Sequence, residues 1–230
     1  GILWNINTDM LQVSTDVPNR PFTKRGILSV INSLYDPLGL FSPIILTGKL
    51  IQRRVIPSKK METPDLDLDW DDPLPTELLD DWNKFKSSLS SISELEVPRC
   101  FKPKNFGKCV QQTLHVFADA SKDSTGLVIY IKSTNEEGKV HVALVSASSK
   151  VAPRSAISIS RMELCAAMDA SAAAQQVIMA LNMEPEDVIL YSDSSVVLGY
   201  LRNRERRFSL YVTRRIQLTL KIFPSTSWKY

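Results

Sequence analysis

The stretch LHVFADAS, residues 114–121, is a run of apolar residues that ends on a single acid, Asp119, before small residues. Such a run predicts a strand of the core. A carboxylate at the end of a core strand has two explanations. It begins a turn, because Asp readily hydrogen-bonds to nearby backbone, or it is held at the rim of a sheet to bind a metal ion.

Two other acids occur in comparable places. The stretch LYSDSS ends a second apolar run on Asp193, and Glu163 falls in the first turn of a long helical segment between the two strands. If the strands are neighbours, Asp119 lies beside Asp193, and a helix packed across the sheet brings Glu163 over both. We therefore expect the three carboxylates to cluster at one edge of a sheet.

Three crowded carboxylates repel one another, and their pKa values rise unless a cation neutralises them. Hard divalent cations prefer oxygen ligands, and Mg²⁺ needs only one or two carboxylates besides waters and substrate oxygens. Two such ions about 4 Å apart activate a water and stabilise the leaving oxygen of a phosphodiester. Asp119, Glu163 and Asp193 are therefore the predicted catalytic and metal-binding residues, with two Mg²⁺ or Mn²⁺ ions as cofactors.

Each acid also has an ordinary structural explanation. Asp119 can begin the turn DASKDSTG, Ser160 and Glu163 match the S-x-x-E capping box, and Asp193 can cap the helix that follows it. Caps and turns are the usual positions of these residue types. These explanations do not account for the convergence of all three acids on one end of the same predicted sheet.

The segments around the acids predict a mixed α/β fold, a five-stranded mixed sheet with helices on its faces. Short turns join the first three strands, which favours antiparallel pairing, and an alanine-rich helix follows them. The fourth strand is a continuous apolar run, typical of a strand buried on both sides. The expected strands are 113–119, 126–133, 139–149, 187–193 and the start of a fifth in 225–230, and the expected helices are 160–181, 194–201 and 207–223.

The first part of the chain predicts a hairpin followed by a small, mostly helical region. Alternating apolar and polar residues in 1–13 indicate the hairpin. Thr23 is a candidate N-cap of a first helix, a second helix covers roughly 43–55, and an acidic, proline-marked linker covers 56–75. The next helix is amphipathic, and its expected apolar face consists of Leu78, Leu79, Trp82, Phe85 and Leu89.

The net charge of +3 conceals a strong asymmetry along the chain. Residues 20–60 and 202–230 each carry eight Lys or Arg against one acid, whereas 62–96 carry eleven Asp or Glu against two Lys. Basic segments favour a polyanion such as nucleic acid as partner, although charged helices often only face water. The residues predicted to follow the phosphates are Arg202, Arg204, Arg206, Arg207, Arg214 and Arg215.

The three cysteines form no C-x-x-C pair, which favours reduced structural thiols in an intracellular protein over a zinc site. We find no apolar run long enough to span a bilayer and no signal peptide, so no membrane association is expected. The chain begins at Gly1 without Met and stops at Tyr230 within an expected strand. It is therefore interpreted as a fragment of a longer protein.

A series of motifs resembles the Pol polyprotein of Pao (BEL/Pao) retrotransposons, and it covers nearly the whole chain. The motifs, in order, are TKRGILSV, YDPLG, LDWDDPLP, DAS, SSKVAP, RMELCAA and DSSVVLGY. The resemblance implies four regions. They are the end of a reverse transcriptase palm in 1–20, thumb-like helices in 21–60, a connection in 61–111, and a ribonuclease H-like domain in 112–230, truncated at its C-terminus.

The resemblance implies that Asp119, Glu163 and Asp193 match three of the family's four metal-binding acids, and that the fourth lies beyond Tyr230. It implies ribonuclease H-type, two-metal hydrolysis of the RNA strand of an RNA–DNA hybrid during reverse transcription. The implied partners are the hybrid or template–primer and the rest of the Pol polyprotein, with its reverse transcriptase palm and integrase. The implied location is the cytoplasm or a virus-like particle.

Two alternatives stay open. The first is a catalytically incomplete module that only binds template–primer. The second is an aspartic peptidase, because this region of Pao elements often carries a peptidase label. That chemistry uses two aspartates in D-[ST]-G turns, whereas Asp119 is followed by Ala-Ser and Asp193 by Ser-Ser. Metal dependence separates the three functions, since an aspartic peptidase needs no metal ion and simple binding falls steeply with salt.

Overall fold

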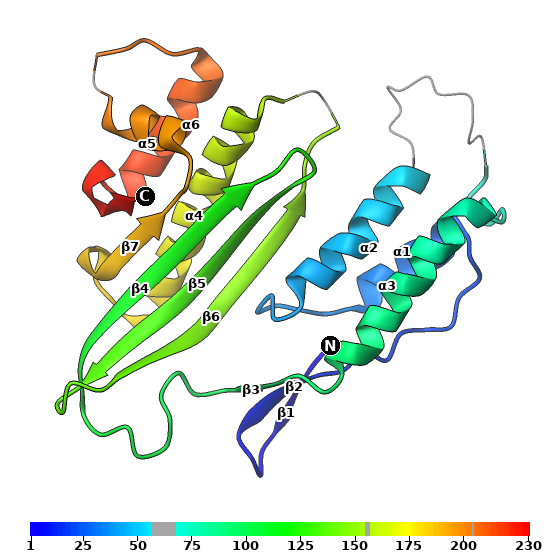
Figure 1. The fold of residues 1–230 in the computed structure, drawn as a ribbon, viewed down its shortest axis with the longest axis horizontal. Helices are drawn as coiled ribbons and strands as arrows, with labels where there is room; N and C mark the ends of the chain where they lie inside the picture. The colour runs from blue at the N-terminus through cyan, green and yellow to red at the C-terminus, as the bar shows by residue number, and fades with distance from the viewer. Residues whose placement is uncertain (57–67, 155–156, 204) are drawn as a thin grey trace. The chain divides into compact units, whose positions relative to one another are not determined.

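The computed structural model describes residues 1–56, 68–154, 157–203 and 205–230. The chain divides into two compact units, Gly1–Cys100 and Phe101–Tyr230, which are described separately (Figure 1). Most of the expected acidic linker, 56–75, lies outside the described residues.

The first unit opens with the expected hairpin. Strands β1 (Ile2–Asn5) and β2 (Met10–Val13) pair antiparallel, and β3 (Glu96–Pro98) adds to β2 from the far end of the unit. The hairpin thus belongs to a three-stranded sheet with the order β1-β2-β3.

The rest of the first unit is helical. It contains α1 (Lys24–Ser33), α2 (Ser42–Val55) and α3 (Leu79–Ile92), with a 3-10 turn at Thr76–Leu78 leading into α3. Thr23 caps α1 as predicted, because its Oγ1 accepts a hydrogen bond from the backbone N–H of Gly26 at 3.0 Å. The helices enclose an apolar core that includes Ile27, Ile31, Ile51, Trp82, Phe85 and Leu89.

The expected apolar face of α3 is correct except at Leu79, which is 37% exposed. Its neighbours on the expected face, Leu78 and Trp82, are buried in the core as predicted. The 3-10 turn ends at Leu78 and α3 begins at Leu79, so the regular periodicity of the helix does not extend back across this junction. The assignment of Leu79 to the buried face was therefore wrong.

The second unit is built on the predicted five-stranded mixed sheet. Its strands are β4 (Cys109–Ala120), β5 (Ser124–Asn135), β6 (Val140–Val151), β7 (Val188–Tyr191) and β8 (Trp228–Lys229), in the spatial order β6-β5-β4-β7-β8. The first three pair antiparallel, while β4–β7 and β7–β8 pair parallel. This arrangement confirms the predicted fold class.

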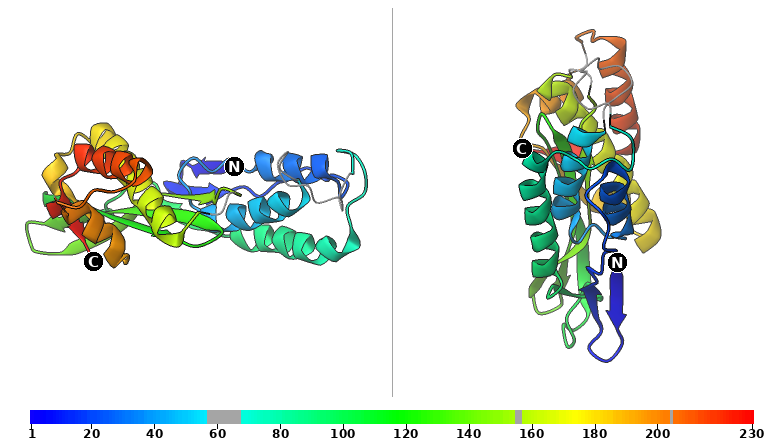
Figure 2. Two further views of the ribbon diagram at one scale, coloured as in Figure 1. Left: turned by 90° about the horizontal axis from the view of Figure 1, so that it is seen from above. Right: turned by 90° about the vertical axis from the view of Figure 1, so that its right-hand side faces the viewer.

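Three helices accompany this sheet: α4 (Ile159–Leu181), α5 (Ser195–Arg202) and α6 (Leu210–Ile222). Helix α4 packs on β4 and β5, and α5 and α6 both pack against α4 (Figures 1 and 2). Small residues such as Ala167, Ala170 and Ala174 are fully buried, which allows α4 to lie close to Leu114 and Val116 of β4. Two 3-10 turns, Pro185–Asp187 and Ser225–Ser227, precede β7 and β8.

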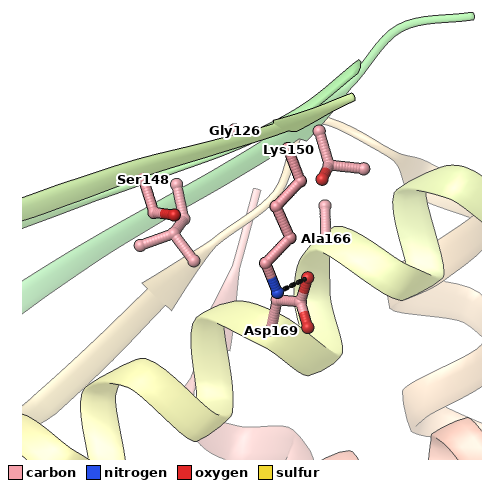
Figure 3. A pocket seen from close by; sticks show the side chains of 7 residues that line it. Gly126, Ser148, Lys150, Ala166 and Asp169 are labelled. Atoms are coloured by element: carbon pink, nitrogen blue, oxygen red, sulfur yellow. Dashed lines mark hydrogen bonds and ion pairs between the residues drawn. The ribbon is translucent and has the colours of Figure 1, made fainter. Parts of the chain in front are cut away.

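By length and composition alone, α4 could cross a membrane, since its 23 residues include a window of mean hydropathy 1.3. From the sequence we expected no apolar run long enough to span a bilayer, and α4 departs from that expectation. The fold provides another reason for the apolar composition, because Leu164, Ala167 and Ala170 lie in the core of the unit. An ion pair also joins α4 to the sheet, where Lys150 of β6 reaches the half-buried Asp169 at 2.8 Å (Figure 3).

The expectation that the fourth strand is buried on both sides was wrong. Val188 and Leu190 of β7 are buried, but Ile189 and Tyr191 are only half-buried. Tyr191 stacks on Phe117 of the neighbouring strand, with ring centroids 4.6 Å apart, and Phe117 remains 41% exposed. Aromatic stacking thus takes the place of a second buried layer on this side of β7.

Candidate metal centre

The sheet places Asp119 and Asp193 side by side. Strands β4 and β7 are parallel neighbours, and Phe117 pairs with Tyr191. Two residues further along from this pair are Asp119, still within β4 and paired with Gly126 of β5, and Asp193, which follows β7 after Ser192. Because the carboxyl ends of parallel strands meet at the same sheet edge, the two acids are level with each other.

Helix α4 brings the third acid to the same place. One carboxylate oxygen of each of Asp119, Glu163 and Asp193 lies within 4.8 Å of the others. Among the residues that the structure describes, this is the one group of three or more Asp, Glu, His or Cys close enough to hold a metal ion together. Since α4 begins at Ile159, Glu163 opens the second turn rather than the first.

The electrostatics of the cluster are unfavourable without a cation. Asp119 and Asp193 are exposed, but Oε2 of Glu163 is shielded from solvent and has no hydrogen-bond partner in the described part of the chain. Burial, followed by the charges of Asp119 and Asp193, raises the pKa of Glu163 from 4.5 to about 7. A solitary buried carboxylate oxygen between two acids needs a positive ligand or a proton at neutral pH.

The two helix caps expected from the sequence do not form, so they explain neither Glu163 nor Asp193. Helix α4 begins after Ser158, so Ser160 lies inside the helix and forms no capping box with Glu163. Helix α5 is capped by Ser194, whose Oγ accepts from the backbone N–H of Val197 at 3.3 Å. Asp193 therefore is not the cap, and Glu163 and Asp193 are left without the structural explanations that their sequence context offered.

The turn after β4 is also closed without the carboxylate of Asp119. Oγ of Ser121 accepts hydrogen bonds from the backbone N–H groups of Asp123 and Ser124, at 3.2 and 3.1 Å. Among the residues that the structure describes, the Asp119 carboxylate accepts only from the adjacent N–H of Ala120, at 2.6 Å, and Asp119 lies inside the strand rather than in the turn. Its position two residues before the turn places the side chain at the sheet edge.

The three acids fit a hard divalent cation. All offer carboxylate oxygens, the donors that Mg²⁺ and Mn²⁺ prefer. Oε2 of Glu163 is buried without a partner among the described residues, and the pKa of this carboxyl group is raised. A bound cation would supply the missing partner and would stabilise the ionised carboxylate. The exposure of Asp119 and Asp193 leaves that side of the cluster open to waters and substrate oxygens.

The predicted phosphate-binding arginines have different surroundings. Arg206, Arg207 and Arg214 are exposed, and Arg202 at the end of α5 donates to the backbone carbonyl of Trp228 at 3.4 Å. Arg204 lies outside the described residues. Their contact with phosphates stays a prediction.

Arg215 differs from the other arginines because it is half-buried against Tyr211 and Cys165. Arg161 of α4, which was not among the arginines predicted from the sequence, also lies over the ring of Tyr211. The sequence signal available for Arg161 is its position one turn before Cys165 on the same helix, and this signal gives no hint of Tyr211 on α6.

Comparison with protein families gives a match over residues 23–194, which include all three acids, to the family described as "Pao retrotransposon-like RNaseH-like domain". The chain belongs to this family. The ribonuclease H-like character of the fold and its retrotransposon origin were both predicted from the sequence. No curated protein sequence matches the chain significantly.

Solved structures are similar to this Pao-family chain at a distance. A foamy viral protease-reverse transcriptase in complex with dsDNA is 17% identical over 92% of the chain and 38% of that protein, with a TM-score of 0.48. Ribonuclease H1 of Halobacterium salinarum NRC-1 is 14% identical over 51% of the chain and 80% of that protein, with a TM-score of 0.32. The family of the chain is shown by the match over residues 23–194, and the candidate metal site is shown by the clustering of its three acids.

Proposed function

We propose that this chain is the ribonuclease H part of a retrotransposon Pol polyprotein, which hydrolyses the RNA strand of an RNA–DNA hybrid with the help of two divalent ions. The observation that carries the proposal is the convergence of Asp119, Glu163 and Asp193 within 4.8 Å, with one oxygen of Glu163 buried and unpartnered. The family supports the same reaction class, because its description names a ribonuclease H-like domain.

In this proposal the fold supplies rigid positions for the ligands. Asp119 is held in the β4–β5 ladder, and Asp193 lies in the short connection between β7 and the capped start of α5. Glu163 approaches from a long helix that packs on the same sheet. Two bound Mg²⁺ or Mn²⁺ ions would activate a water and stabilise the leaving oxygen. The side chains hold the cations and leave the solvent side of the cluster open for the substrate.

The proposal extends to the partners and to the regions of the chain. The exposed Arg206, Arg207 and Arg214 would follow the phosphates of the hybrid. Residues 1–20, 21–60 and 61–111 would be the end of a reverse transcriptase palm, a thumb and a connection. The remainder of the polyprotein would supply the palm, the integrase and a fourth acid.

A nuclease assay with labelled RNA in an RNA–DNA hybrid tests the reaction. A chain that continues past Tyr230 through the proposed fourth acid should cleave the RNA strand in Mg²⁺ or Mn²⁺ and should be inactive in EDTA. Residues 1–230 alone should cleave poorly, because the proposed fourth acid would help to hold one of the two ions. Both ions are needed to stabilise the attacking and leaving oxygens.

Site variants make the test specific. Asp119→Asn and Asp193→Asn should abolish cleavage in the extended chain, because an amide cannot supply the negative charge that the ions require. Asp123→Asn, which changes an exposed acid in the neighbouring turn, is the matched control and should retain activity. Cleavage by Asp119→Asn would show that the site is assigned to the wrong residues.

Two other outcomes identify the alternative functions. Hybrid binding without cleavage in the extended chain would favour a module that only binds template–primer. Metal-independent cleavage of a peptide at acidic pH would favour an aspartic peptidase. The structure gives the peptidase no support, because Asp119 and Asp193 share their site with Glu163 rather than forming a pair in two D-[ST]-G turns.

A further inference from the structure

A second charged cluster lies where α4 and α6 pack together. The guanidinium carbon of Arg161 lies 5.1 Å from the centre of the Tyr211 ring, and that of Arg215 lies 3.5 Å from it. Both distances are within the range of a cation–π contact. The two positive charges are therefore held around one aromatic ring, no further apart than the sum of these distances.

The position of Arg215 is fixed by the protein itself. Its Nε donates to Sγ of Cys165 at 3.2 Å, and its Nη1 donates to the backbone carbonyl of Tyr211 at 3.3 Å. Sγ of Cys165 also lies 3.2 Å from the hydroxyl of Tyr211. Within the part of the chain that the structure describes, nothing accepts a hydrogen bond from Nη2 of Arg215, so this nitrogen is available to a ligand.

Neither arginine has an acidic partner among the residues that the structure describes. No carboxylate of the described residues forms an ion pair with Arg161 or Arg215, although other basic residues of the same unit do have acidic partners, as Lys150 has in Asp169. Two like charges without an anion are unfavourable, and the planar guanidinium group is suited to binding phosphate with two hydrogen bonds. The cluster thus has the composition of a phosphate-binding site.

The cluster also has a defined relation to the three acids. Arg161 precedes Glu163 by two residues, which places the two side chains on roughly opposite sides of the first turns of α4. A single phosphate cannot occupy both places. An extended polyanion can place one phosphate at the acids and another at the arginines, because a nucleic-acid strand carries a charge about every 3.4 Å along its axis.

We propose that Arg161, Tyr211 and Arg215 form a second anchor for the nucleic acid, which binds one backbone phosphate between the two guanidinium groups. The nature of the polyanion rests on the proposed function, which makes it an RNA–DNA hybrid. Tyr211 and Cys165 are positioning residues that orient Arg215. The anchor sets how the duplex lies across α4 and contributes no group to the reaction at the acids.

Binding of a fluorescent RNA–DNA hybrid to residues 1–230 in EDTA tests the anchor without requiring cleavage. Loss of one phosphate contact should lower the slope of log K against log salt by about 0.9, which corresponds to roughly eightfold weaker binding in 0.1 M salt. We expect this loss for Arg161→Gln and for Arg215→Gln. The double variant should lose little more than either single variant, because both arginines hold the same phosphate.

Two further variants, and the exposure of Arg161, control the measurement. Arg161 is exposed, so Arg161→Gln tests the anchor even if a change at the half-buried Arg215 disturbs packing. Arg215→Lys keeps the charge but loses the planar fork, and it should fall between wild type and Arg215→Gln. Lys221→Gln removes an exposed charge in the last turn of α6 and should leave the affinity unchanged.

The outcomes separate the anchor from the proposed function. If wild type binds hybrid and both glutamine variants bind it equally well with an unchanged salt slope, the anchor is wrong while the nuclease proposal stands. Fully additive losses in the double variant would also overturn it, because they indicate two separate phosphates. If the arginine variants weaken binding but the extended chain never cleaves, the anchor stands and the nuclease proposal fails.

Discussion

Replacing Glu163 with Gln should remove a pH-dependent loss of stability in the second unit when no divalent metal is present. In the folded protein the pKa of Glu163 is raised to about 7, whereas the unfolded chain has the ordinary value of 4.5. Between these values the folded protein binds the proton more tightly than the unfolded chain. Raising the pH through this window therefore lowers the free energy of unfolding, and the loss is complete above pH 7.

The size of the effect follows from the same shift. A difference of this size in pKa corresponds to at most about 3.5 kcal/mol, since one unit is worth about 1.4 kcal/mol. Glu163 is only half-buried and its two neighbours are exposed, so solvent screening reduces the expected loss to about 1–2 kcal/mol between pH 4.5 and pH 8. The glutamine side chain of Glu163→Gln cannot ionise, so this variant should not show the loss of stability between pH 4.5 and pH 8.

Amide hydrogen exchange of β4 and β5 peptides in EDTA, corrected for intrinsic rates, measures the stability of the second unit separately from the first. The stability difference between variant and wild type should shift in favour of Glu163→Gln by about 1–2 kcal/mol from pH 4.5 to pH 8. Glu186→Gln, which removes an exposed carboxyl group from the same unit, should show no comparable shift. An equal pH dependence in wild type and Glu163→Gln would refute the reasoning.

The same protein links the prediction to metal. Saturating Mg²⁺ or Mn²⁺ at pH 8 should restore wild-type stability, by about 2.7 kcal/mol at a hundred times the dissociation constant, because only the folded chain assembles the site. Glu163→Gln should gain less, since one ligand has lost its charge. Equal stabilisation of both proteins would place the bound metal somewhere other than this cluster.

Three further predictions concern the fold and the basic surface. Thr23→Ala should destabilise the first unit by about 1 kcal/mol in a denaturant titration, because it removes the cap of α1. Gly48→Ala should destabilise the same unit by about 1–3 kcal/mol, because the added carbon would lie 2.7 Å from the buried ring of Phe85, and unchanged stability would mean that the ring can move aside. Reversing Arg206 and Arg207 to Glu should weaken hybrid binding for every sequence and lower its salt dependence, whereas an unchanged slope would make them ordinary solvated charges.

The clustering of the acids could be predicted from the sequence because strand ends carry positional information. Asp119 and Asp193 each end an apolar run, and parallel neighbours meet at one edge of the sheet, so their proximity required only the correct strand order. The chemistry of the site was less accessible. The burial of the Glu163 oxygen depends on how closely α4 packs against the sheet, and the local sequence pattern does not predict this packing.

Other features were decided by contacts between distant segments. The apolar run of β7 predicts burial on both sides, yet Tyr191 is half-buried because its partner Phe117 is itself exposed. The position of Leu79 depends on a 3-10 turn that breaks the helical phase. The contact of Arg161 and Arg215 with Tyr211 joins residues from α4 and α6, and spacing within either helix does not reveal it.

The local structure around the three acids separates a functional from a structural role. Ser194 and Ser121 already perform the capping and turn-closing tasks that the sequence allows Asp193 and Asp119 to perform. The capping box expected of Ser160 and Glu163 does not form, because α4 begins at Ile159. Stability alone does not then favour three carboxylates at one sheet edge, since burial and the charges of Asp119 and Asp193 raise the pKa of Glu163 and weaken the folded state at neutral pH. The arrangement becomes favourable when a cation binds, so the destabilisation of the metal-free protein and its relief by Mg²⁺ are two measurements of the same property.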